Sequence, residues 1–171
     1  MEQEQLKSAC QHELNLVLSF FPRVDAKASV VLAVDTGMLG YLATHLPSLN
    51  SLRWWELGIP ALAFALLALS LWHLYRGAFP NLSGGHSSLI YFSEIAKRTE
   101  AKFIDQFIEQ RESEYVKDML GQAWRNSEIL KEKFDHLKGA FIFMAWSVLP
   151  WTVALADFAL RMPSGQASSG K

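Results

Sequence analysis

The sequence has little of what most enzyme and metal sites are built from. Its single cysteine, Cys10, cannot form an internal disulfide, and its five histidines show no HExxH or HxH spacing, so we expect no metal site. The phosphate-binding motifs GxGxxG and GxxxxGKS/T and the nucleophile motif GxSxG are absent. Glu94 and His86 alone are too few acid–base groups for an enzyme site, so neither catalytic residues nor a cofactor are expected.

An excess of positive charge is also missing. The formal net charge is -1, and binding to DNA or RNA would need a basic face, so no nucleic-acid partner is expected. Lysine and arginine are nearly absent from three segments, residues 28–52, 57–75 and 139–160. The segment between the last two is crowded with charges of both signs.

Long apolar runs fill these three segments. A helix rises ~1.5 Å per residue and bilayer hydrocarbon is ~30 Å thick, so a membrane span needs about 20 apolar residues. The runs 57–75 and 139–160 meet this requirement, and 28–46 meets it apart from Asp35. A soluble domain of this size rarely buries three helices that are apolar on every side. We therefore predict an all-α membrane protein with transmembrane helices at 28–48, 56–76 and 139–160.

The first residues predict a surface helix rather than a cleaved signal, because acidic residues stand where a basic region would be expected. Residues 1–24 carry an amphipathic stripe, and Pro22 should end this helix before the first span. Basic residues flank the spans on one side, which predicts a cytoplasmic N-terminus and a cytoplasmic segment at 77–138. Residues 161–171 are predicted to form a disordered periplasmic tail.

The cytoplasmic segment 77–138 shows two helical faces separated by a polar stretch, which predicts a hairpin of helices 88–110 and 114–138 between the second and third spans. No breaker separates the second helix from the third span, so the two can form one helix. Pro150 should kink this helix within the membrane.

Asp35 is the polar residue that the first span must accommodate. A charged side chain at mid-span costs about 2.5–3.5 kcal/mol, so it should not face lipid. Either it takes part in an interhelical contact or a pore, or it is protonated or bonded to a neighbour such as Thr36. Arg23, Asp25 and Lys27 form a polar collar before the span, as membrane anchors or as contacts to a ligand or another helix.

The stretch SSLIYFSEIAKR, residues 87–98, combines aromatic and basic side chains. A flat ring can stack on a base and a cation can pair with a phosphate. Tyr91 and Phe92 are therefore candidates for stacking, and Lys97 and Arg98 for the phosphate. The same spacing also occurs in helices whose aromatic residues belong to the core.

Several stretches in order along the chain resemble the Pycsar transmembrane effectors of bacterial antiphage defence. They are DAKAS before the first span, SSLIYFSEIA after a proline-containing loop, and EKFDHLKGAF before the last span. The resemblance covers about residues 23–160. The chain departs from the usual family pattern at Ala26, where threonine is more common, and at Ser93, where glycine is frequent.

The resemblance implies that a partner nucleotide cyclase makes a cyclic pyrimidine mononucleotide, cyclic UMP or cyclic CMP, in response to phage. The effector, which is not an enzyme, binds this ligand in its cytoplasmic part. Its transmembrane helices then damage the lipid of the bacterial inner membrane, and infection aborts. Because three helices make a poor pore alone, we expect a homo-oligomer.

A constitutive membrane scaffold is the alternative. The charged, alternating faces of residues 88–138 would equally suit recruitment of a soluble partner protein to a small membrane subunit.

Overall fold

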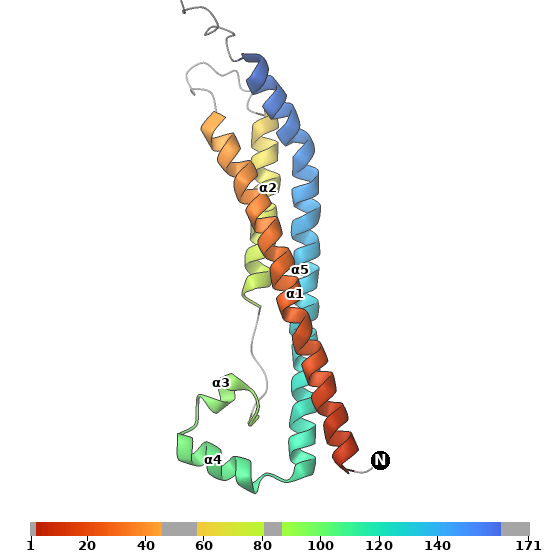
Figure 1. Ribbon diagram of the computed structural model, residues 1–171. Helices are drawn as coiled ribbons and strands as arrows, with labels where there is room; N and C mark the ends of the chain where they lie inside the picture. The colour runs from red at the N-terminus through yellow and green to blue at the C-terminus, as the bar shows by residue number, and fades with distance from the viewer. Residues whose placement is uncertain (1–2, 46–57, 81–86, 162–171) are drawn as a thin grey trace, which may run out of the picture. The chain divides into compact units, whose positions relative to one another are not determined.

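Helices account for nearly all of the chain that the computed structural model describes, namely residues 3–45, 58–80 and 87–161. They are α1 (Gln3–His45), α2 (Gly58–Ala78), α3 (Phe92–Ile95), α4 (Glu100–Glu109) and α5 (Glu112–Arg161) (Figure 1). No strand occurs within the described ranges, which confirms the all-α class. The tail predicted beyond residue 161 lies outside the described residues.

Two compact units share these helices. The polar unit comprises residues 1–26 and 77–135, and the apolar unit comprises residues 27–76 and 136–171. The long helices α1 and α5 each contribute residues to both units.

The apolar unit is packed around small residues. Ala63 and Ser70 of α2 and Ala140 and Ser147 of α5 are all fully buried. Small side chains at helix contacts let the backbones approach closely, which is typical of helix packing in membranes. Two clusters of apolar side chains complete the core of this unit: Met38, Leu42, Ala63, Leu67, Ala154 and Phe158, and separately Val31, Leu74 and Ala140.

Most of the apolar surface of α2 and α5 faces outward. Both helices contain an 18-residue stretch apolar enough to cross a membrane, and only 22% and 17% of these stretches are buried. A core helix of a soluble protein would be mostly buried, whereas here Phe64, Trp146 and Leu149 are 59%, 67% and 67% exposed. Exposed apolar surfaces of this kind are typical of helices that contact lipid. Within the described residues α1 does not contain such a stretch, so the span at 28–48 stays a prediction.

The prediction that Pro22 ends the first helix is wrong, because α1 continues through Pro22 to His45. Proline removes one helical hydrogen bond and costs ~3 kcal/mol or more. Packing on both sides of Pro22 offsets this cost. Val24 is only 2% exposed, and the Lys133 ammonium lies 5.5 Å from the centre of the Phe21 ring.

The predicted helix 88–110 is also wrong in its first half. The structure has only the single turn α3 before α4, because the Ser88 hydroxyl oxygen accepts the backbone N–H groups of Ile90 and Tyr91. Such local bonds compete with a continuous helix. A new helix, α4, then starts at Glu100, and the side chain of the preceding Thr99 caps it by accepting the N–H of Lys102.

The predicted continuity between the helix 114–138 and the apolar run 139–160 is confirmed. α5 runs unbroken from Glu112 to Arg161 and passes through Gly121 and Pro150. The kink expected at Pro150 stays a prediction.

Candidate functional site

Arg98 holds the segment 87–98 together. Its guanidinium donates to the carbonyl oxygens of Ser87 (2.9 Å), Ser88 (3.0 Å) and Glu94 (2.6 Å), and to the side-chain oxygen of Gln106 (2.9 Å). Four of its five N–H donors are therefore engaged within the protein. Arg98 has a structural role here, whatever else it contacts.

The other three predicted nucleotide contacts lie on the same segment. The rings of Tyr91 and Phe92 are 5.0 Å apart in an edge-to-face arrangement, and Phe92 is 65% exposed. The Lys97 ammonium pairs with Glu94, while its side chain stays 64% exposed. An accessible ring and an accessible cation thus occur together, and their contact with a nucleotide stays a prediction.

The segment is anchored to α5 within the polar unit. The backbone N–H of Leu89 donates to the Asp118 carboxylate (2.8 Å), and Leu89 itself is 8% exposed. Ile90 packs against the buried cluster that contains Cys10 and Met119. Cys10 is thus a buried apolar contact rather than an accessible thiol.

A pocket of about 460 Å³ lies elsewhere in the polar unit. Its walls come from α1, from the end of α4 and from the start of α5, and its lining residues are Lys7, Gln11, Phe107, Gln110, Glu112 and Tyr115. Sequence reasoning missed this pocket, because the lining residues are up to 108 positions apart in the chain.

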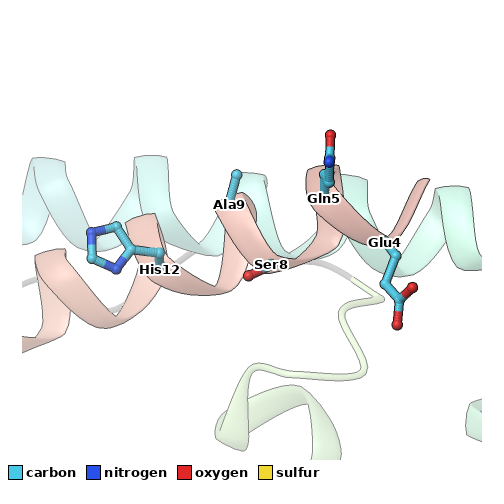
Figure 2. A pocket seen from close by; sticks show the side chains of 5 residues that line it. All are labelled: Glu4, Gln5, Ser8, Ala9 and His12. Carbon is cyan, nitrogen blue, oxygen red and sulfur yellow. The ribbon is translucent and has the colours of Figure 1, made fainter. Parts of the chain in front are cut away.

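A second hollow runs along the first turns of α1 and is lined by Glu4, Gln5, Ser8, Ala9 and His12. Figure 2 shows that Glu4 and Gln5 point in different directions from this helix. The side chains do not converge on one point, so this hollow offers a small ligand no shared set of contacts.

The polar collar before the first predicted span makes contacts within the polar unit. Arg23 lies 5.2 Å from the centre of the Phe20 ring, and the Asp25 carboxylate accepts a hydrogen bond from the Lys133 ammonium of α5 (2.5 Å). Asp25 is thus an interhelical contact. Lys27 is exposed and belongs to the apolar unit.

Replacing Lys133 by alanine should lower the free energy of unfolding by about 1 kcal/mol. The Lys133 side chain is only 11% exposed, although the 56% exposure of its partner Asp25 keeps the pair partly screened by solvent. Lys131→Ala is the matched control. Lys131 pairs with Asp135 where both side chains are mostly exposed, and its loss should change stability by less than about 0.5 kcal/mol. Thermal unfolding of the detergent-solubilised protein measures both, and equal effects would contradict the role given to Lys133.

Asp35 lies in the apolar unit, where it joins three helices. The carboxylate is fully buried, and its Oδ2 accepts a hydrogen bond from the Ser70 hydroxyl of α2 (2.6 Å). The carbonyl oxygen of Ala140 in α5 also lies 2.9 Å from this hydroxyl, so the two acceptors share its single hydrogen. Thr36, the neighbour considered as a partner, donates instead to the Leu32 carbonyl (2.7 Å). We call the set Asp35, Ser70 and Ala140 the polar clasp.

The polar clasp is incompletely satisfied. Oδ1 of Asp35 is buried and has no hydrogen-bond partner among the described residues. Ser70 was missed in the sequence, although a lone serine in an apolar run is the kind of partner that a carboxylate in a neighbouring run requires. The Asp35 carboxylate and the Ser70 hydroxyl thus form an interhelical contact, which is one of the alternatives considered for Asp35.

A pair of histidines lies close to the clasp within the apolar unit. His73 Nδ1 is 3.3 Å from His136 Nδ1, and the His73 ring stacks on Phe143 at 5.4 Å. Gly139 faces the same ring so closely that an added Cβ would lie 2.6 Å from His73 Nδ1. The glycine is therefore required for the close approach of α2 and α5.

Together these features define a class. The chain is a small helical membrane protein whose apolar unit exposes its α2 and α5 surfaces, and whose polar unit carries charged helices and a pocket. Residues 9–159 match the family described as the Pycsar effector protein domain, and the chain belongs to this family. It is thus an effector of antiphage defence, in a family that is not a known enzyme family. No curated protein and no solved structure matches the chain.

Proposed function

We propose that this effector binds a cyclic pyrimidine mononucleotide, cyclic UMP or cyclic CMP, and then impairs the bacterial inner membrane, so that infection aborts. The family match over residues 9–159 carries the proposal, because the family works in cyclic nucleotide signalling with a partner cyclase.

The two units divide these tasks. The polar unit receives the ligand, and the apolar unit acts on the lipid. The chain crosses the membrane three times, with its N-terminus and residues 77–138 in the cytoplasm, and it assembles as a homo-oligomer. Support comes from the outward apolar surfaces of α2 and α5 and from the charged character of the polar unit.

Ligand binding can act only if one arrangement of the helices binds the nucleotide better than another. α1 and α5 each contribute residues to both units, so either helix can couple a change in one unit to the other. Tyr91, Phe92, Lys97 and Arg98 are the contacts that the sequence proposes for the ligand.

Titration calorimetry on the detergent-solubilised protein tests the first step. One of the two cyclic pyrimidine nucleotides should release or take up heat in a saturable way, and cyclic AMP serves as the comparison ligand. Absence of saturable heat with both pyrimidine nucleotides would refute nucleotide binding.

A constitutive scaffold remains the second candidate, favoured by apolar side chains on the surface of the polar unit. Trp124 and Ile108 are 65% and 76% exposed, and Leu120 lies one turn before Trp124 on α5. A scaffold would bind its partner through such a surface without ligand. Growth arrest that occurs without cyclic nucleotide would favour this function. Absence of growth arrest in the presence of the nucleotide would also favour it.

A further inference from the structure

We propose that the pocket between α1, α4 and α5 is where the polar unit binds the cyclic nucleotide, an inference that rests on the proposed function. Its volume of about 460 Å³ lies within the range of ligand sites, roughly 300–1,000 Å³. All of its lining residues belong to the polar unit.

The aromatic side chains of the pocket suit a base. Phe107 of α4 and Tyr115 of α5 meet edge to face, with ring centres 6.0 Å apart and planes at 82°. Phe107 is 44% exposed, so part of its surface is open to a planar group. Stacking on a side-chain ring is how proteins commonly hold single bases.

Lys7 supplies the positive charge. Its ammonium lies 5.7 Å from the centre of the Tyr115 ring, and none of the salt bridges among the described residues includes it. A cation held by a ring keeps its charge for an anion, whereas Lys97 pairs with Glu94. The cyclic phosphate carries one negative charge, which Lys7 can match.

The amide of Gln110 supplies a hydrogen-bonding group that needs a partner. Its Oε1 atom is buried, and no described residue donates to it. A buried acceptor without a donor is unfavourable. Because Oε1 is buried, the Gln110 side chain must turn toward the pocket before uracil N3–H or the cytosine N4 amino group can donate to it. Glu112, the acidic member of the lining, can accept a hydrogen bond from the ribose 2′-hydroxyl.

This pocket fits a nucleotide better than the segment 87–98 does. Arg98 already donates four hydrogen bonds within that segment, and Lys97 is paired. In the pocket, Lys7 contacts a ring but forms none of the salt bridges among the described residues, and Gln110 Oε1 has no donor there. A ligand there would also contact α1, α4 and α5 together, which lets it stabilise one arrangement of the polar unit.

Calorimetry on full-length variants tests the site, with the nucleotide that the wild-type protein binds. Phe107→Ala should weaken binding by about tenfold or more, because base stacking is lost. Ile108→Ala, which removes a more exposed neighbour on α4, should leave binding unchanged. Lys7→Gln should weaken binding and reduce its dependence on salt, whereas Lys117→Gln on α5 should do neither. Circular dichroism and melting temperature confirm that each variant folds.

Phe92→Ala decides between the two locations. Loss of binding in Phe92→Ala together with normal binding in Phe107→Ala and Lys7→Gln would overturn the pocket and leave the proposed function intact. Absence of binding in the wild-type protein would instead refute the proposed function, and the pocket with it. Weakened binding in Phe107→Ala and Lys7→Gln, with folded protein, would support the pocket.

Discussion

Asp35→Leu should abolish growth arrest while leaving nucleotide binding unchanged. Asp35 belongs to the apolar unit, and the pocket and the segment 87–98 belong to the polar unit, so the ligand contacts remain intact. A buried carboxylate with one unpaired oxygen is a costly interhelical contact, and an apolar side chain at this position would avoid the polar burial penalty. We infer that the carboxylate serves the rearranged, membrane-damaging state.

Two related variants separate hydrogen bonding from charge. Asp35→Asn keeps an oxygen that can accept from Ser70 but cannot ionise, and Ser70→Ala removes the donor to the buried carboxylate. Ser70→Ala should lower the free energy of unfolding by about 1–3 kcal/mol, because a buried acceptor then has no partner.

Colony formation on co-expression with the partner cyclase measures toxicity for each variant. Full toxicity of Asp35→Leu would remove Asp35 from the mechanism.

Gly139→Ala should destabilise the protein, and Gly121→Ala should stabilise it. Both glycines lie inside α5, where alanine is favoured over glycine by about 1 kcal/mol. A Cβ at Gly121 meets nothing within 4 Å, whereas at Gly139 it would overlap the His73 ring. Overpacking of this kind typically costs about 1–3 kcal/mol. Because both variants gain the same helix propensity, the difference between their melting temperatures reports the clash.

A second substitution tests whether His73 is the cause. Removing the ring with His73→Ala should recover the stability that Gly139→Ala loses, so the two effects should not be additive. Additive effects, or a stable Gly139→Ala single variant, would show that α2 and α5 do not approach as closely as described.

The parts of the fold that depend on composition could be predicted from the sequence. α2 and the apolar half of α5 are recognisable because bilayer thickness sets a length that few soluble helices combine with so little charge. The continuity of α5 also followed from the sequence, since no breaker lies between residue 125 and the apolar run that begins at residue 139.

Features that depend on particular side-chain contacts could not be predicted. Local proline chemistry favours a break at Pro22, but buried neighbours on α1 hold the helix together. Apolar spacing favoured a helix from residue 88, but the Ser88 side chain captured the backbone N–H groups instead. Only the three-dimensional structure shows which serine among the apolar runs meets Asp35.

The candidate site shows the same limit. Aromatic and basic residues close together in sequence pointed to Tyr91, Phe92, Lys97 and Arg98, and Arg98 then proved to hold its own segment together. The pocket combines residues of α1, α4 and α5 with Gln110, which lies between α4 and α5. The buried Gln110 Oε1, which no described residue donates to, has no sequence signature.

Dye release from liposomes containing the purified protein tests the central claim, that a ligand on the polar unit makes the apolar unit damage a bilayer. Cyclic UMP or cyclic CMP should release the dye from these liposomes, with no release in the absence of nucleotide or from liposomes carrying Asp35→Leu. Release that is the same with and without nucleotide, or no release with either nucleotide, would contradict the account.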